Sequence, residues 1–308
     1  MDNLSVIPVI LTVITAATPL VFAALGELVV EKSGVLNLGV EGLMLIGAVA
    51  GFATATLTGS ATIGVFAAII AGAALSMIFA VIVLQLRANQ VATGLALTLF
   101  GTGLAALIGQ GYVGFPVEPL PRIAIPLLAD IPVVGPILFH HDPLVFLSVL
   151  MTGAVWWFLY RTHSGLVLRA VGESHDSAHA LGYSVSGVRY AAIAFGGGMG
   201  GLAGGYLSLV YSPMWAENMT AGRGWIALAL VVFATWKPTR ILAGAYLFGG
   251  VTILQLWAQG QAVAVASQWL SMLPYLATII VLVLISNDRA SMRLHTPAAL
   301  GKPFHPSR

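Results

Sequence analysis

The chain contains no cysteine and very few charged residues. Without Cys there can be no disulfide bond, no thiolate nucleophile and no Cys-ligated metal. Asp, Glu, Lys and Arg make up only 8% of the 308 residues, whereas hydrophobic residues make up 58%. A soluble domain carries about 25% charged residues, so this chain could not cover a water-exposed surface. The composition therefore predicts an integral membrane protein.

The spans also lack ionisable residues in their middles, and this weighs against two functional classes. A secondary transporter driven by an ion gradient needs such groups at membrane depth, and only Glu41 comes near. An intramembrane serine protease needs a buried base, but all 7 His residues fall in predicted loops or in the tail. Gradient-driven transport stays an alternative, and proteolysis is disfavoured.

Long apolar runs, separated by short polar or Gly/Pro-rich breaks, dominate what is present. A bilayer core about 30 Å thick requires about 20 apolar residues per helix, and roughly nine such runs occur. We expect an all-α polytopic transmembrane bundle of about nine spans, with a range of about 8 to 10, in a single domain over residues 1–308. The expected spans are 4–25, 35–57, 62–86, 90–110, 143–160, 189–210, 224–236, 240–258 and 269–286. The run 224–236 is short for a full span, and a half-helix is the alternative.

The positions of Lys and Arg predict the orientation, because short loops rich in these residues stay in the cytoplasm. If the loop at Arg87 is inside, alternation places all of the 13 Lys and Arg residues inside except Arg122 and Arg223. The N-terminus then lies outside and the C-terminus in the cytoplasm. Three segments lie outside the bilayer: an external Pro-rich loop at 111–142, a cytoplasmic loop at 161–188 that contains one short amphipathic helix, and a cytoplasmic tail at 287–308.

Three charged residues follow the first apolar run. Glu27, Glu31 and Lys32 fall in a predicted loop at 26–34. A carboxylate facing lipid costs at least about 2.5 kcal/mol. We therefore expect these three side chains at the membrane surface, where water and headgroups solvate them.

A polar pair, Asn37 and Glu41, lies one turn apart in the glycine-rich stretch SGVLNLGVEG. Glycines at this density permit a broken helix, and broken helices are tolerated where they line a cavity. The alternative is that Glu41 caps its own helix near the cytoplasmic surface. The dipeptide Arg223-Gly224 precedes an apolar run much as Glu41-Gly42 does, which suggests an inverted repeat. The candidates for a translocation path are Asn37, Gly39, Glu41, Gly42, Asn89, Arg223 and Gly224.

Several other motifs have two readings. GGGMGG at 196–201 matches a dinucleotide-binding pattern, but it follows no strand, and close helix packing explains its spacing better. His175 and His179 have metal-ligand spacing, although a solvated helix face is the simpler interpretation. Tyr211 and Trp215 could stack on a ring-shaped solute or serve only as interfacial aromatics.

Five motifs in order resemble one known family: SGVLNLGVEG, the RAVGE…A…LG segment, GGLAGGYLSL, GRGWIALALVVF and PAALGKPF. Together they resemble the permease subunit of bacterial ABC importers of the simple-sugar, nucleoside and branched-chain amino-acid branch, nearest the nucleoside type. The resemblance covers residues 17–304. It implies a path for a nucleoside or simple sugar, with branched-chain amino acids as the alternative substrate.

The resemblance also implies partners and a location. Such permeases pair with a second related permease, take substrate from an extracytoplasmic binding lipoprotein, and bind an ABC ATPase that holds ATP and magnesium. This chain has no Walker motif, so we expect no cofactor, no metal and no catalytic residue in it, membrane lipid around it, and no nucleic acid. The location implied is the bacterial inner membrane. The residues matching the family's ATPase-coupling loop are Arg169, Gly172, Glu173, Ala178, Leu181 and Gly182.

Overall fold

The computed structural model describes residues 3–124, 131, 134–260, 268–269, 272–286 and 296–305. The helices of the first half are α1 (Asn3–Lys32), α2 (Val40–Thr58), α3 (Ala61–Ala80) with the π-helical turn η1 (Val81–Gln85), α4 (Gln90–Gly109) with the short η2 (Gln110–Tyr112), and α5 (Val134–Phe139). Those of the second half are α6 (Pro143–Arg161), α7 (His163–Glu173), α8 (His175–Ala180), α9 (Val185–Tyr206) with η3 (Leu207–Tyr211), α10 (Arg223–Phe233), α11 (Pro238–Gly260) and α13 (Leu273–Ser286). The described part thus confirms a predominantly helical protein.

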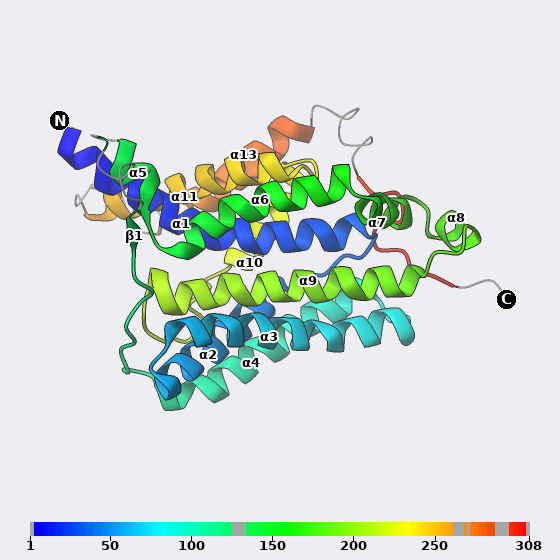
Figure 1. Cartoon of the computed structure of the whole chain (residues 1–308), viewed down its shortest axis with the longest axis horizontal. Helices are drawn as coiled ribbons and strands as arrows, with labels where there is room; N and C mark the ends of the chain where they lie inside the picture. Colours follow the sequence, from blue (N-terminus) through cyan, green and yellow to red (C-terminus); the bar gives the residue numbers. More distant parts are fainter. Residues whose placement is uncertain are drawn as a thin grey trace.

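The long helices run roughly along the longest axis of the molecule (Figure 1). Helix α9 lies between a layer made of α2, α3 and α4 and a layer that contains α1, α6 and α11, and α10 lies near the centre. Helices α7 and α8 lie at one end, together with the C-terminus. The opposite end carries α5 and two short antiparallel strands, β1 (Ile123–Ala124) and β2 (His140–His141), in which Ile123 pairs with His141.

Seven helices in the described part are long and apolar enough to cross a membrane. Two expected boundaries are wrong: the first span continues to Lys32 instead of ending at 25, and the span expected at 35–57 begins at Val40. Helix α10 has only 11 residues, about 16 Å of rise, as the half-helix alternative predicts. The last expected span is described as the 14 residues of α13.

The glycines of α9 bring three helices into backbone contact, which confirms the packing interpretation of GGGMGG. A Cβ atom at Gly201 would overlap the carbonyl oxygen of Ala68 in α3, and one at Gly204 would overlap that of Met44 in α2. On α1, a Cβ at Gly26 would lie 3.0 Å from the carbonyl oxygen of Gly196, a looser but still close contact. Small residues let helices approach in this way inside a bilayer, where van der Waals packing drives association. Helix α9 therefore lies at the centre of the bundle, packed against α1, α2 and α3.

Candidate functional site

The segment 33–39 between α1 and α2 is non-helical and lies inside the bundle. Because α1 continues to Lys32, no surface loop exists at 26–34, and the expectation that Glu27, Glu31 and Lys32 are solvated is wrong. Their side chains are 2%, 2% and 8% exposed. Glu, Lys and Leu are good helix formers, so the first helix extends through the charged residues instead of ending before them.

Side chains satisfy the backbone of this buried segment. The bonds are Leu36 N–H to Gln90 Oε1 (2.8 Å), Asn37 N–H to Glu27 Oε1 (3.1 Å), Gly39 N–H to Asn37 Oδ1 (2.9 Å) and Thr98 Oγ1 to the Leu38 carbonyl (3.0 Å). Non-helical backbone at membrane depth persists only where it is buried in protein or lines a cavity, since unpaired polar groups cost several kcal/mol in lipid. The side chains of Glu27 and Asn37 therefore stabilise the non-helical conformation of residues 33–39.

Glu41 caps another helix rather than its own. Its Oε1 accepts hydrogen bonds from Thr220 Oγ1 (2.6 Å) and from the Gly222 N–H (2.8 Å), and its Oε2 accepts one from the Gly224 N–H (2.6 Å). The carboxylate thus occupies the N-terminus of α10, where free N–H groups and the helix dipole favour negative charge. The expectation of a cap at the cytoplasmic surface is wrong.

The same contact corrects the expected depths of two motifs. Glu41-Gly42 and Arg223-Gly224 were expected near opposite faces of the membrane, but Gly224 packs directly on the backbone of Glu41. The non-helical segment 33–39 carries the chain back along α1, where the Asn37 N–H meets Glu27, so α2 begins inside the bundle. The N-termini of α2 and α10 meet there, and Glu41, in the first turn of α2, caps α10.

Arg223 connects this junction with Tyr211 at the end of η3. Its Nη1 donates to the carbonyls of Met219 and Thr220 (both 3.2 Å), and its guanidinium lies 5.5 Å from the ring centre of Tyr211. Tyr211 is partly exposed, as a role in solute stacking requires. Trp215 is not: only 3% exposed, its indole is packed against Gly109, so the stacking hypothesis is wrong for this residue.

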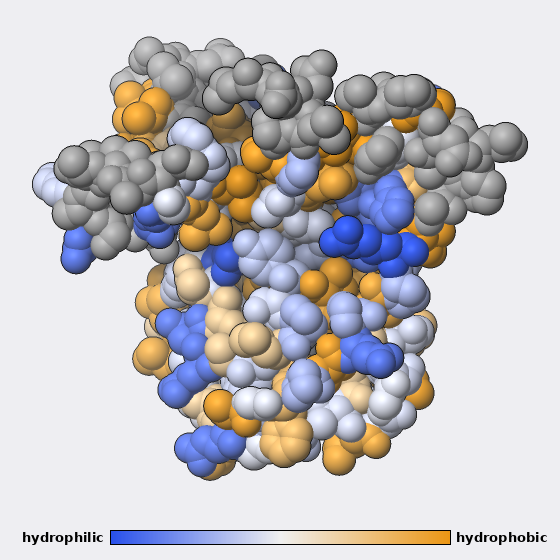
Figure 2. Space-filling view, turned by 90° about the vertical axis from the view of Figure 1, so that its left-hand side faces the viewer, coloured by the Kyte–Doolittle hydropathy of each residue, from blue (hydrophilic) through white to orange (hydrophobic). Residues whose placement is uncertain are grey.

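A cavity of about 690 Å³ opens beside Tyr211. Its lining residues are Thr12, Thr15, Pro119, Leu120, Pro121, Arg122, Asp142, Val210, Tyr211 and Ser212. Pockets for small molecules commonly measure about 300–1,000 Å³, so the size suits a single sugar or nucleoside. The described surface of this end mixes hydrophilic and apolar residues (Figure 2), as expected where a membrane protein meets water.

The sequence HHD at 140–142 suggests a merely polar cluster, but Asp142 is buried and forms the N-cap of α6. Its Oδ1 accepts from the Leu144 and Val145 N–H groups (3.0 and 3.1 Å), and its Oδ2 accepts from the Tyr206 hydroxyl (3.3 Å). Burial raises the pKa of Asp142, and these hydrogen bonds oppose the shift. Asp142 thus fixes the wall of the cavity at the start of α6.

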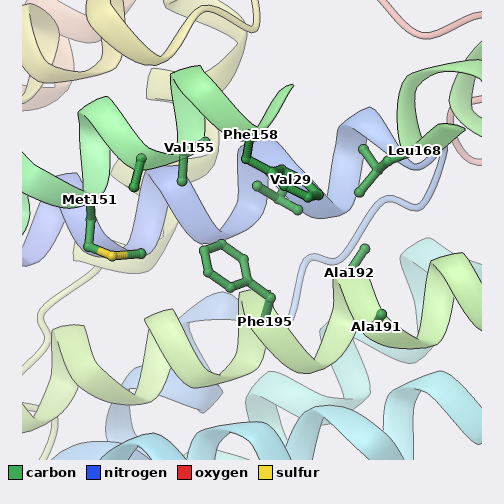
Figure 3. A pocket seen from close by; sticks show the side chains of 9 residues that line it. Val29, Met151, Val155, Phe158, Leu168, Ala191, Ala192 and Phe195 are labelled. Atoms are coloured by element: carbon green, nitrogen blue, oxygen red, sulfur yellow. The ribbon is translucent and has the colours of Figure 1, made fainter. Parts of the chain in front are cut away.

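A second pocket, of about 250 Å³, is formed by α1, α6, α7 and α9 (Figure 3). Phe195 points from α9 toward α6, across from Val155 and Phe158. All nine lining side chains are apolar. They offer no hydrogen bond to a hydroxyl-rich solute, so the cavity beside Tyr211 suits such a solute better. Asn89 lies apart from both: it is exposed and caps α4 through the Ala92 N–H (3.0 Å).

The segment expected to couple to an ATPase forms two helices, α7 and α8, instead of one. Ser174 adopts an extended conformation between them and caps α8. Gly182 has φ +87°, which confirms the expected helix stop. Gly172 and Ala178 are buried against the molecule, whereas Glu173 and Leu181 are exposed. Only the exposed members of the set are therefore free to contact another chain.

Arg189 ties this segment to the buried break and to the tail. Its Nε donates to the Ser33 carbonyl (3.2 Å), its Nη1 to the Lys302 carbonyl (3.4 Å), and its Nη2 contacts His175 Nδ1 (3.4 Å). Backbone bonds add to the assembly: the Ala299 N–H donates to Gly172 (2.9 Å) and the Gly301 N–H to Gly34 (3.1 Å). The PAALGKPF motif of the tail is thus part of the packed end of the molecule.

His175 and His179 are neither metal ligands nor a purely solvated face. Phe304 lies between them, with ring centres 5.4 and 5.3 Å away. Within the ranges that the structure describes, no group of three His, Cys, Asp or Glu residues could hold a metal ion.

Comparison with known proteins gives one family. Residues 9–283 match the family model described as "Branched-chain amino acid transport system / permease component". No solved structure matches the chain significantly.

Three relatives are similar over most of their length. A putative glucose ABC transporter permease protein of Haloferax volcanii is 42% identical, with 95% of each chain covered. A nucleoside ABC transporter permease protein of Lactococcus lactis is 33% identical over 87% of this chain and 89% of the relative. A guanosine ABC transporter permease protein of Bacillus subtilis is 31% identical over 99% and 98%.

Proposed function

Because the chain belongs to the family of permease components of branched-chain amino acid transport systems, we propose that it forms the membrane path of an ATP-driven importer for a simple sugar or nucleoside. The relatives are ABC permeases for glucose and for nucleosides. It is a multi-pass membrane protein of a transporter, and the ATP-hydrolysing chemistry belongs to a separate subunit.

The junction at Glu41 is the observation that carries this proposal. A solute in the cavity of about 690 Å³ meets Tyr211, whose ring contacts Arg223. Arg223 donates a hydrogen bond to the Thr220 carbonyl, and the Thr220 hydroxyl donates one to Glu41. A neutral solute with several hydroxyl groups can exchange hydrogen bonds with each of these in turn, whereas the aliphatic side chain of a branched-chain amino acid cannot. Two helix N-termini that converge on one buried carboxylate resemble the broken-helix sites of other transporters.

We also propose partners and an orientation that suit the permease subunit of an ABC importer. An ABC ATPase would contact the exposed residues of α7 and α8, a substrate-binding lipoprotein would deliver solute at the end that carries β1 and α5, and a second related permease would complete the path. The N-terminus would lie outside and the C-terminus inside, in a plasma membrane of the bacterial inner-membrane type. About nine spans, including α10 as a half-span, remain our preferred count.

The experiment is uptake into proteoliposomes that contain this chain, its neighbouring permease and ATPase, and the binding protein. We expect ATP-dependent accumulation of labelled nucleoside or glucose, and no accumulation of leucine. Leucine uptake alone would favour the branched-chain alternative. Uphill uptake by this chain without the ATPase, on a proton or sodium gradient, would overturn the proposal.

A further inference from the structure

A small pocket lies between the last turns of α6 and the start of α11. Trp156, Tyr160, Lys237, Pro238 and Thr239 line its volume of about 240 Å³. The rings of Trp156 and Tyr160 are 6.4 Å apart and tilted by 47°. The pocket therefore has aromatic walls on α6 and an ammonium group at the N-terminal edge of α11.

Two further cations are bound to these aromatic walls. The Arg169 guanidinium lies 5.2 Å from the centre of the Tyr160 ring, and that of Arg161 lies 5.9 Å from the Trp156 ring. Arg169 Nε is shielded from solvent, and the residue as a whole is half-buried. Its positive charge is therefore screened less than that of a fully exposed side chain.

Carboxylates nearby do not cancel this positive charge. Arg169, Lys237, Glu31 and Glu173 all lie within electrostatic range of Lys32. Glu31 and Glu173 set two negative charges against the positive charges of Lys32, Arg169 and Lys237, and Glu173 is exposed to solvent. Among the described residues that line the pocket, Lys237 is charged and none is a carboxylate.

The position of the pocket identifies the kind of molecule that fits it. Helix α6 ends at Arg161, and Trp and Tyr at span ends settle at the level of lipid headgroups. From Tyr160 an exposed stripe runs along α6 toward the membrane interior through Trp156, Gly153 and Val149. A Cβ at Gly153 would meet nothing within 4 Å, so this stripe is a shallow track with room for an acyl chain.

We propose that an anionic phospholipid binds at this place. Its phosphate lies in the pocket at Lys237, with Arg169 at the Tyr160 ring as a second positive charge nearby, and one acyl chain follows the stripe over Gly153. The cations favour a headgroup with net negative charge, such as phosphatidylglycerol, and repel choline. The proposal does not depend on which solute the protein transports.

Native mass spectrometry of the purified full-length chain tests this, with phosphatidylglycerol and phosphatidylcholine of identical acyl chains added in equal amounts. We expect preferential retention of phosphatidylglycerol. Lys237→Gln should reduce the preference about fivefold, since one basic residue near a membrane surface contributes about 1 kcal/mol to binding of anionic lipid. Lys237→Arg should retain it.

Arg240→Gln is the matched control, because Arg240 is exposed, lies outside the pocket and already donates to Thr235 Oγ1 (2.7 Å). It should leave the lipid preference unchanged. Equal retention of the two lipids by the unaltered chain, or equal losses in Lys237→Gln and Arg240→Gln, would overturn the proposal. So would displacement of the lipid by millimolar inorganic phosphate, which would identify a free anion as the ligand.

Discussion

The carboxylate of Glu41 and the backbone N–H of Gly224 form a 2.6 Å hydrogen bond across 183 positions of sequence. The bond joins the first turn of α2 to the first turn of α10, inside the bundle. The Glu41 carboxylate is buried in protein, away from lipid. Thr220, Gly222 and Gly224 satisfy it there with three hydrogen-bond donors. The Glu41 carboxylate thereby fixes the start of α2 against the start of the short helix α10.

Replacing Glu41 by Gln should weaken this anchor. The amide group of Gln would point an N–H at one of the three donors and leave it unpaired, at a cost of about 1–3 kcal/mol. We expect a lower unfolding temperature in detergent and a loss of solute uptake. Glu118→Gln is the control, because Glu118 lies in the loop that follows α4 and is exposed. An unchanged melting temperature in Glu41→Gln would contradict the anchoring role.

Gly201→Ala should destabilise the bundle strongly. The added methyl group would overlap the Ala68 carbonyl, which belongs to the backbone and cannot move without shifting α3. Overpacking of this kind costs about 1–3 kcal/mol or more. Gly103→Ala is the matched control, since the space around Gly103 in α4 is open. Thermal unfolding of the two variants in the same detergent measures the difference, and equal stability would refute the close packing.

Arg189→Met should release the tail. The variant loses the bonds to Ser33, His175 and Lys302 but keeps much of the apolar stem. We expect chymotrypsin to cut after Phe304 at least several-fold faster than in the unaltered chain. Arg87→Met should affect this rate less, because Arg87 is exposed and is hydrogen-bonded to His305, beyond the cleavage point. Equal cleavage rates would show that Arg189 does not hold the tail.

Acid should loosen the same contact. Burial is the main cause that lowers the pKa of His175, and the positive charge of Arg189 lowers it further. The Asp176 carboxylate opposes this shift, whereas Lys302 and His305 add to it. A His with a depressed folded-state pKa binds fewer protons folded than unfolded, so stability falls as pH drops below about 6.5 toward the folded pKa. Tail cleavage should therefore accelerate below pH about 6.5. His175→Gln should flatten this profile, and an unchanged profile would contradict the assignment.

Glu173→Arg tests the coupling surface. Glu173 is exposed at the end of α7, so reversing its charge should leave the fold intact while reducing recovery of the ATPase with the permease. Co-purification from membranes measures this. His179→Arg, on the neighbouring α8, is a comparison for a general effect of added positive charge. Full recovery of the ATPase with Glu173→Arg would exclude a docking role for this residue.

Patterns that act locally could be predicted from the sequence. Composition and apolar runs predict the membrane class, the spacing of Gly197, Gly201 and Gly205 predicts close packing, and Gly182 predicts a helix stop. Each of these depends on the residue type and its near neighbours alone.

The contacts of the candidate site could not be predicted in the same way. Local helix propensity allows α1 to continue through Glu27 and Glu31, but it does not show that these side chains are buried. Their burial depends on distant partners, which are Asn37 for Glu27 and Trp236 for Glu31. The depth of Glu41 follows from the non-helical course of residues 33–39, which SGVLNLGVEG permits but does not require.

The glycine contacts of α9 limit how this transporter can change shape. Where Gly201 meets the Ala68 carbonyl in α3 and Gly204 meets the Met44 carbonyl in α2, no side chain lies between the backbones, so these helices cannot slide past one another there. We expect α2, α3 and α9 to move as one rigid body during a transport cycle. Conformational change is then confined to the connections at the edge of this unit, residues 33–39 and residues 212–222. These are the two segments that meet at Glu41.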